Sequence, residues 1–518
     1  MTERIVVVGF GPVAARLVDE LLPAVRSGLA HLTVIGEEAE AAYNRVLVAD
    51  LGVGRTTASA LALSDAAALI ADGVDVRLGV RVRRVDRARQ QLVLSDGTSP
   101  GYDRLVFATG SRPVIPNLTG LNPDPAAPVL PPGVTALRDL RDASVLHAAV
   151  TGGKRVVVLG GGVLGLETAL AAAEEGATVT VVHNGPHPLG RNIDRGGGAV
   201  LAAALRNCGV RVAGNARSTG VEHNGPDGGF SALLLDDGSA IDGDLLVLSC
   251  GVRPRTELAE GSGLSTGAGI LVDHKLRAHH EPHIFAIGDC AEVRCPDPEC
   301  LECRTARGPS GLVGPGWRQA EWLAEYLTLL ASRAQEAELL LPLPAELPGV
   351  IVLKARGLTM AVAGDVSADP WDEEALCAGA ADGRPRLQIA QWADPGHGRY
   401  VKMTTRAGVL EGLVAVGMPR TAAELVQLFE RGAELPADRS LLLRLDGPDQ
   451  AAAPGAADPE RTVCRCAGVS GTKIAAAVTD GCGTVAEVSG ATRAGTGCGG
   501  CHDEIKGIIE KHFQGAVA

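Results

Sequence analysis

Aromatic side chains are scarce in this chain of 518 residues: Phe, Trp and Tyr together make up 3% of it. A core with so few rings has to be built from Ala, Val and Leu, which is typical of buried parallel sheets flanked by Ala-rich helices. Long apolar runs are also missing, since no stretch reaches the roughly 18 residues that a membrane-spanning helix needs. The composition therefore favours an α/β protein with no membrane span, and the length predicts about three or four domains.

An excess of positive charge is absent as well. Lys and Arg number 48 against 61 Asp and Glu, and no basic run is interleaved with aromatic residues. This excludes the nucleic-acid backbone as a partner. The start Met passes directly into a strand-like segment without the regions of a signal peptide, so we expect a cytoplasmic protein. In that compartment the twelve cysteines, none of which precedes Cys208, are more typical of metal binding or catalysis than of disulfides.

A first glycine motif follows the apolar segment IVVVG and opens a predicted helix. Gly9 permits a tight turn, Gly11 lets the backbone approach a pyrophosphate, and Pro12 begins the helix. Ala14 is small enough for the helix to pack on the strand, and Glu37 ends the next strand, where its carboxylate can bind ribose hydroxyls. The motif by itself also fits a turn without a ligand. With strand, helix and acid in register, it predicts a dinucleotide site.

A second motif of this kind contains Gly160, Gly162 and Gly165, again between a strand and a helix. The following strand ends at His183 and not at an acid, and no arginine stands there to pair with a 2′-phosphate. The choice between NADH and NADPH therefore stays open. His183 is either an adenosine-ribose contact or a plain surface residue.

The order of motifs GFGPVA, Glu37, ATG, GGGVLGLE, GVRP and FAIGD resembles that of the flavoprotein reductases with two dinucleotide folds, the pyridine nucleotide-disulfide oxidoreductase type. These proteins bind FAD first along the chain and a nicotinamide dinucleotide second. The resemblance implies that Asp289 holds the ribityl chain of FAD and that Glu167 lies where flavin and nicotinamide meet. It implies further cofactor contacts at Thr109, Gly110 and Gly251.

Two further residues take roles from the same resemblance. Arg45, in AYNRVL, matches a phrase of the nitrite-reductase and rubredoxin-reductase branch and is assigned to the FAD phosphates or ribose. Trp317, in GLVGPGWRQA, matches the helix start that places an aromatic ring beside the isoalloxazine, although packing of the helix on the sheet is an alternative. The first helix region has no cysteine, which disfavours direct thiol chemistry at the flavin.

Four cysteines near the C-terminus form two close pairs, Cys464 with Cys466 and Cys498 with Cys501. Two pairs of thiolates among glycines are the ligand set that a [2Fe–2S] cluster requires. The phrase resembles the [2Fe–2S] domain of the bacterioferritin-associated-ferredoxin type. A structural zinc ion is the alternative at the same four cysteines.

A second group, Cys290, Cys295, Cys300 and Cys303, directly follows Asp289 in a segment that resembles an insertion. Four thiolates there predict either a metal site, as a [4Fe–4S] cluster or zinc, or inert thiols in a surface loop.

The expected organisation is an FAD-binding domain from residues 1–115 and 250–331 and an NAD(P)H-binding domain at 116–249. Residues 350–445 form a small α/β unit that resembles the C-terminal domain of rubredoxin and nitrite reductases. A Pro- and Ala-rich linker at 446–461 leads to the small [2Fe–2S] domain at 462–518.

A path for electrons follows, from NAD(P)H to FAD to the [2Fe–2S] cluster and on to a partner protein. The phrase VHNGPHPLGRNID resembles nitrite reductase large subunits, but the cysteine pairs of a sirohaem site are absent from this sequence. The expected function is therefore that of the electron-transfer subunit of an assimilatory nitrate reductase, whose partner carries molybdenum. The alternatives are a ferredoxin or rubredoxin reductase in an oxygenase system and a redox-sensing iron–sulfur flavoprotein.

Overall fold

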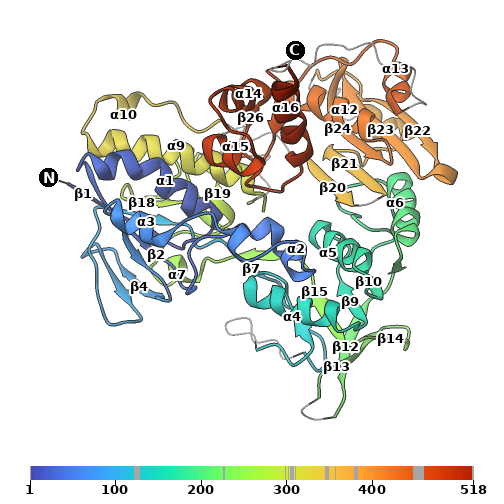
Figure 1. Cartoon of the computed structure of the whole chain (residues 1–518), viewed down its shortest axis with the longest axis horizontal. Helices are drawn as coiled ribbons and strands as arrows, with labels where there is room; N and C mark the ends of the chain where they lie inside the picture. The colour runs from blue at the N-terminus through green and yellow to red at the C-terminus, as the bar shows by residue number, and fades with distance from the viewer. Residues whose placement is uncertain are drawn as a thin grey trace.

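The computed structural model describes residues 2–121, 129–225, 228–297, 299–300, 303, 308–309, 311–344, 349–355, 357–377, 383–446 and 460–515. Most of the predicted linker, residues 447–459, lies outside this range. Figure 1 shows two parallel sheets with helices packed on them, an antiparallel sheet and a small helical unit. The predicted α/β class with two Rossmann-like folds is confirmed.

The first sheet has five parallel strands in the order β18-β6-β1-β2-β3. Its strands are β1 (Glu3–Val8), β2 (Ala30–Ile35), β3 (Asp75–Arg77), β6 (Arg104–Phe107) and β18 (Ile284–Ala286). Most of their side chains are buried, as expected for a parallel sheet covered on both faces. Helices α1 (Pro12–Arg26) and α9 (Val313–Ala331) pack side by side on it (Figure 1).

The second sheet is also parallel, in the order β11-β10-β9-β15-β8. Its strands are β8 (Val134–Thr135), β9 (Val156–Leu159), β10 (Val179–Val182), β11 (Val210–Ala213) and β15 (Leu245–Leu248). The helices of this unit are α4 (Leu140–Thr151), α5 (Val163–Glu174) and α6 (Arg195–Asn207). An antiparallel sheet adjoins it, made of β12 (Ser218–His223), β13 (Phe230–Leu235) and β14 (Ala240–Asp242).

Two short strands, β7 (Ser111–Pro113) and β16 (Val252–Pro254), pair antiparallel where the chain leaves the first fold and returns to it. The first fold also carries a hairpin of β4 (Val82–Asp86) and β5 (Gln91–Leu94), and the pair β17 (Ile270–Val272) and β19 (Ala291–Val293). Further α-helices in the described part of this fold are α2 (Val48–Gly52), α3 (Ala66–Ala71), α7 (Glu257–Glu260) and α10 (Glu336–Leu339). The second fold is therefore inserted into the first.

The third unit is an antiparallel sheet in the order β20-β21-β24-β23-β22. It contains β20 (Ile351–Ala355), β21 (Leu358–Gly364), β22 (Gln388–Asp394), β23 (Arg399–Arg406) and β24 (Val409–Val416), with helices α11 (Glu373–Cys377), α12 (Pro419–Arg431) and α13 (Ser440–Leu443). Helix α12 packs its apolar face on this sheet. The other face meets α5 and α6 of the second fold.

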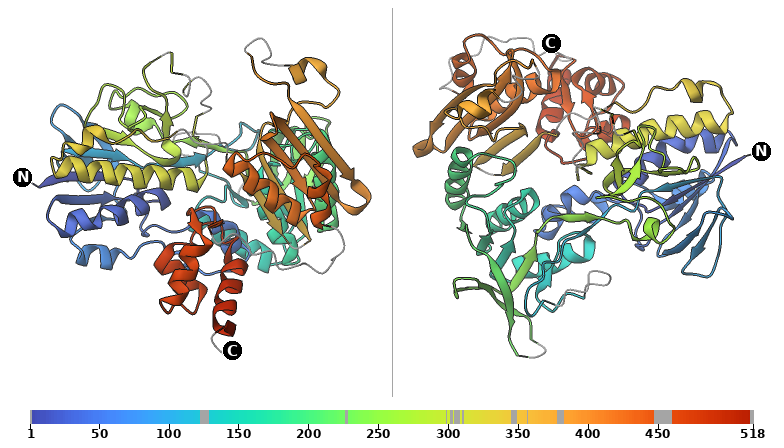
Figure 2. Two further views of the ribbon diagram at one scale, coloured as in Figure 1. Left: turned by 90° about the horizontal axis from the view of Figure 1, so that it is seen from above. Right: turned by 180° about the vertical axis from the view of Figure 1, so that it is seen from behind.

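The last unit is small and mainly helical. It has two short strands, β25 (Thr462–Cys464) and β26 (Val469–Ser470), and helices α14 (Gly471–Thr479), α15 (Val485–Thr492) and α16 (His502–Gly515). In Figure 1 it lies between the α1/α9 pair and the antiparallel sheet, and Figure 2 shows its helices projecting to one side of the other units. None of the helices in the described part of the chain combines the length and apolar character that crossing a membrane takes.

Candidate functional site

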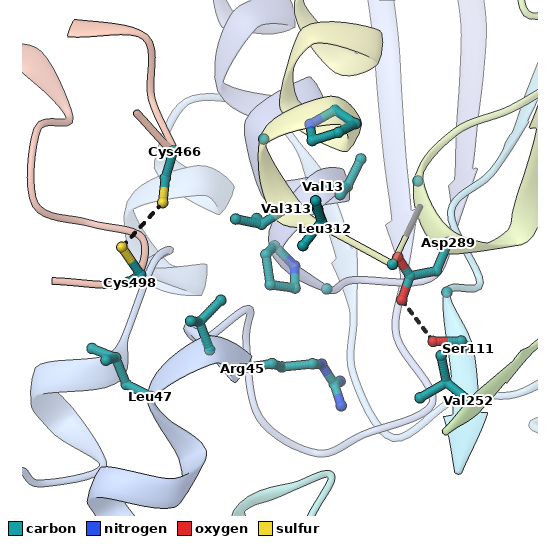
Figure 3. A pocket seen from close by; sticks show the side chains of 18 of the residues that line it. Val13, Arg45, Leu47, Ser111, Val252, Asp289, Leu312, Val313, Cys466 and Cys498 are labelled. Atoms are coloured by element: carbon teal, nitrogen blue, oxygen red, sulfur yellow. Dashed lines mark hydrogen bonds between the residues drawn. The ribbon is translucent and has the colours of Figure 1, made fainter. Parts of the chain in front are cut away.

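A cavity of about 2420 Å³ opens where the first two folds, the antiparallel sheet and the helical unit meet. Figure 3 shows its two ends: the Cys466 and Cys498 thiols at one, and Asp289 beside Ser111 at the other. Arg45 and the start of α9 lie between them. The residues lining it come from the first glycine motif, from α5 of the second fold and from the cysteine pairs. The glycines of the second motif, His183 and Gly251 are not among them.

The first glycine turn forms one wall. Gly9 has a φ of +105°, and a Cβ atom there would lie 2.2 Å from the Ala108 carbonyl oxygen, so only glycine fits. Gly11 is the N-cap of α1 and Pro12 its first residue, while Ala14 is buried against the sheet. Because Gly11 has only the tip of the Arg45 side chain near its Cβ position, the helix N-terminus is open to an anionic group.

Glu37 and Arg45 both line the cavity. The Glu37 carboxylate is within 3.5 Å of Arg81 and 3.4 Å of Arg255. Arg45 forms an ion pair with Glu38, and its guanidinium lies 4.9 Å from the centre of the Tyr43 ring. Burial alone would raise the pKa of Glu38, but the Arg45 charge and the Tyr43 hydroxyl hold it below its ordinary value.

Asp289 stands at the far end of the cavity with Thr109 and Gly110. The Ser111 hydroxyl donates to its carboxylate at 2.6 Å, and Arg138 Nη2 lies 3.2 Å from the same oxygen. Burial lowers the pKa of Arg138, and its Nε atom is buried with no hydrogen-bond partner. A buried guanidinium in this cavity with one N–H group left without a partner fits an anionic cofactor such as FAD. The sequence analysis missed Arg138, which has no motif around it.

Trp317 is buried at the start of α9, as the packing interpretation expects, and its place beside the isoalloxazine stays a prediction. Its ring is 5% exposed, its Nε1 donates to the Pro12 carbonyl at 3.1 Å, and it is not among the residues that line the cavity. The indole instead lies under the cysteine unit, since a Cβ atom on Gly497 would be 3.6 Å from it. Packing at the start of α9 is therefore what the ring does in this structure.

The second glycine turn has the same local form as the first. Gly160 has a φ of +129° and a Cβ atom there would lie 2.0 Å from the Ser249 carbonyl oxygen, while Gly162 is the N-cap of α5. A Cβ atom on Gly165 would lie 2.4 Å from the Gly160 carbonyl oxygen, so the helix packs closely on the turn. Gly251 has a φ of +97° and open space at its Cβ position.

His183 is 6% exposed, so it is not the surface residue that one interpretation allowed. Burial lowers its pKa, and its Nε2 atom has no hydrogen-bond partner. Glu167, on α5, lines the cavity on the side of the second fold. Burial, with added repulsion from Cys498 and Asp50, raises the pKa of Glu167 to about 7.

The four cysteines of the helical unit gather at one end of the cavity. The Cys466 and Cys498 sulfurs are 3.3 Å apart, and the Gly495 amide donates to Cys464 Sγ at 3.4 Å. Hydrogen bonds from the Cys501 thiol and the Gly495 amide lower the pKa of Cys464. Amide donors and a thiol that ionises readily fit the ligands of an iron–sulfur cluster. Cys464, Cys466, Cys498 and Cys501 all line the cavity that also contains Gly11 and Asp289.

The second cysteine group is only partly brought together. The sulfurs of Cys295, Cys300 and Cys303 lie close to the ring of His274. Cys290 is apart from them, fully buried, with its thiol directed at the carbonyls of Phe107 and Ile287. The spacing in the sequence predicts Cys290 as the fourth member of a metal-binding group, whereas in the structure His274 takes that position.

Two glycine-turn folds and a cysteine unit around one cavity define an oxidoreductase of the dinucleotide-binding flavoprotein class. Residues 3–309 match the pyridine nucleotide-disulphide oxidoreductase family, and residues 462–511 match the BFD-like [2Fe–2S] binding domain. The chain belongs to the pyridine nucleotide-disulphide oxidoreductase family and carries a [2Fe–2S] domain behind it. FAD, a nicotinamide dinucleotide and a [2Fe–2S] cluster are the cofactors of this combination.

Individual relatives cover almost the whole chain. It is 32% identical over 514 residues to the nitrite reductase [NAD(P)H] large subunit of Klebsiella oxytoca, covering 98% of this chain and 48% of that protein. It is 25% identical over 512 residues to the assimilatory nitrate reductase electron transfer subunit of Bacillus subtilis, covering 98% of this chain and 59% of that protein. The chain thus spans about half the length of these relatives.

Among solved structures, the covalent putidaredoxin reductase–putidaredoxin complex has the same fold over 85% of this chain and 95% of that chain, with a TM-score of 0.67 and 22% identity.

Proposed function

We propose that this chain takes electrons from NAD(P)H and delivers them, through FAD and its own [2Fe–2S] cluster, to the molybdenum subunit of an assimilatory nitrate reductase. A hydride brings two electrons and the cluster accepts one, so bound FAD, which exchanges either one or two, would connect them. One observation carries the proposal: Cys466 and Cys498 line the same cavity as the FAD-side residues Gly11 and Asp289.

The residues of the chain have separate tasks in this reaction. Gly11 and Arg138 would hold the anionic part of FAD, and the wall formed by α5 with Glu167 would orient the nicotinamide towards it. The antiparallel sheet with α12 and the cysteine unit line the cavity on its third side, where they would flank the bound flavin. No general acid or base is needed for electron transfer.

The docking of the cysteine unit supports intramolecular electron transfer. A Cβ atom on Gly314, at the start of α9, would lie 3.5 Å from the Cys466 carbonyl oxygen. Arg465 lies 3.4 Å from Glu430 of α12, so the unit contacts both the first fold and the antiparallel sheet. Nitrate reduction is the favoured destination because the relative from Bacillus subtilis matches both the flavoprotein part and the cysteine unit.

The second candidate is a reductase for a separate ferredoxin or rubredoxin of an oxygenase system. The fold shared with putidaredoxin reductase favours it. A cluster domain in the same chain, lining the cavity, argues against the need for a separate ferredoxin.

The test is to mix the FAD- and iron-loaded protein with its candidate nitrate reductase subunit, NAD(P)H and nitrate. We expect oxidation of the nicotinamide that depends on nitrate, and its loss in Cys464→Ser, which removes a cluster ligand and keeps the FAD-side residues Gly11 and Asp289. Oxidation that requires an added ferredoxin would instead support the second candidate. No nitrate-dependent oxidation with a partner that is active with artificial donors would overturn the proposal.

A further inference from the structure

Three cysteines and one histidine, outside the electron-transfer site, bring their ligand atoms together. His274 lies in the turn after β17, and Cys295, Cys300 and Cys303 lie in the segment after β19. The His274 ring nitrogen and the three sulfurs are all within 4.8 Å of one another. Within the described residues, this is the only group of His, Cys, Asp or Glu side chains that converges in this way.

The distances between these atoms are those around a single small ion. His274 Nε2 is 3.4 Å from Cys300 Sγ and 3.5 Å from Cys303 Sγ, and the Cys295 and Cys303 sulfurs are 3.5 Å apart. Zinc bonds of about 2.3 Å to sulfur and about 2.0–2.1 Å to nitrogen give tetrahedral edges of roughly 3.8 Å and 3.6 Å. The four side chains are therefore almost in place before any ion is added.

We propose that His274, Cys295, Cys300 and Cys303 bind one Zn²⁺ ion in a closed structural site. Three thiolates and an imidazole form a Cys3His set, which zinc prefers and which leaves no coordination position for a substrate. A four-iron cluster binds each ligand to a different iron atom, so its ligand atoms stand further apart than around one ion. Convergence within 4.8 Å favours a single ion over a cluster.

The position of Cys290 separates this site from the flavin. Cys290 follows Asp289 directly, but its thiol is fully buried and contacts the Phe107 and Ile287 carbonyls at 3.4 and 3.2 Å. It cannot turn to the other three cysteines without leaving the core. The zinc site is therefore built from His274 and the segment beyond β19, and it takes no part in the electron path.

The ion would join the turn after β17 to the segment after β19, which the pairing of these two strands and a contact of His279 Nε2 with the Arg294 carbonyl already bring close. The His274 carbonyl also accepts from the Leu343 amide at 2.9 Å, which ties the same turn to the segment after α10. Beyond Cys303 the chain runs to Gly311 and Leu312, which line the cavity before α9 begins. The zinc ion would hold the start of this cavity wall in place.

The test measures zinc and iron per chain in the holoprotein, purified without a metal-affinity tag, and records the zinc K-edge X-ray absorption. We expect about one zinc per chain with three sulfur neighbours and one nitrogen neighbour, beside about two irons for the cluster. His274→Ala and Cys303→Ser should lose the zinc and keep the iron. Cys377→Ser, which removes an exposed cysteine elsewhere, should change neither.

Three results would overturn the proposal. Zinc with four sulfur neighbours would mean that the ion sits on the cysteines of the helical unit. Iron well above two per chain, lost in Cys303→Ser, would mean that this group holds a cluster. Zinc well below one per chain, with a disulfide between Cys295 and Cys303 found by mass spectrometry, would make the group a thiol pair. Each variant's flavin absorbance reports whether it has folded, independently of its metal content.

Discussion

The side-chain amide of Asn44 donates to the carbonyl oxygens of Thr496 and Gly497, both at 2.6 Å. Asn44 and Gly497 are 453 positions apart in the sequence. Asn44 is 5% exposed and belongs to the first fold, while Gly497 immediately precedes the ligand Cys498. An ion pair between Arg493 and Asp19 of α1 lies in the same contact. The cluster loop is therefore held on the first fold by hydrogen bonds next to its own ligands.

Replacing Asn44 should loosen this contact and slow electron transfer to the cluster. Asn44→Ala removes two hydrogen bonds, each of which contributes about 1 kcal/mol, so we expect cluster reduction by NADH to slow by up to about thirtyfold. Reduction of the flavin itself should be unchanged. Asn207→Ala, an exposed position at the end of α6, is the control. Equal rates of cluster reduction in Asn44→Ala and wild type, measured by stopped flow, would show that the contact does not matter.

Arg138 should contribute to FAD binding through its buried guanidinium. Arg138→Met removes the positive charge and leaves Asp289 with the Ser111 hydroxyl alone, so we expect the Kd for FAD to rise at least about tenfold. The measurement is fluorescence titration of the apoprotein with FAD. Arg206→Met, on the exposed end of α6, should bind FAD as the wild type does. An unchanged Kd in Arg138→Met would contradict the assignment.

Glu167 should make stability depend on pH. Its pKa of about 7 in the folded protein lies above the ordinary value of a glutamate, so the folded state keeps a proton that the unfolded state has lost. The free energy of unfolding should then fall as pH rises from about 4.5 to about 7, by roughly 3 kcal/mol at most. Glu167→Gln has no carboxyl group to titrate, so its stability should not fall in this way. The Tm of Glu167→Gln minus that of wild type should therefore increase between pH 5 and pH 8.

The control for that series is Glu222→Gln, an exposed glutamate on β12. It removes a carboxylate from the surface and leaves the cavity unchanged. A difference in Tm between Glu167→Gln and wild type that does not change with pH would mean that Glu167 ionises normally.

Asp194 should stabilise the contact between the second fold and the antiparallel sheet. Its carboxylate caps α6 through the Gly197 amide at 3.2 Å, accepts from the Tyr400 hydroxyl, and lies 3.4 Å from the Lys402 ammonium, which is 2% exposed. Asp194→Ala leaves that cation buried with backbone carbonyls alone, so we expect a loss of about 2–4 kcal/mol. Asp65→Ala removes only an exposed cap of α3 and should cost about 1 kcal/mol. If Asp194→Ala and Asp65→Ala lose the same free energy of unfolding in thermal denaturation, the buried ion pair adds nothing to stability.

The glycine turns could be predicted from sequence because their chemistry is local. Gly9 and Gly160 need a positive φ and a close approach to a neighbouring strand, and both requirements leave a pattern within a few residues. The pairs of cysteines in the helical unit are likewise spaced within single loops. Such features do not depend on how distant segments meet.

Other parts of the site depend on distant segments and left no signal in the sequence. The contact of Asn44 with Gly497 joins residues hundreds of positions apart, and Arg138 lies in the loop just before α4 with no motif around it. His274 precedes the cysteine segment by more than twenty positions and reaches it only because β17 and β19 pair. Trp317 followed the family's pattern, but the cysteine unit covers it here.

The central claim is that electrons from NAD(P)H reach the [2Fe–2S] cluster of this chain through its flavin. The most direct test mixes the anaerobic holoprotein with NADH, freezes samples over time, and records flavin absorbance and the EPR signal of the reduced cluster. We predict that the cluster signal follows flavin reduction in wild type, and that Cys464→Ser retains flavin reduction without the signal. A flavin that is fully reduced while the wild-type cluster stays oxidised would contradict the account.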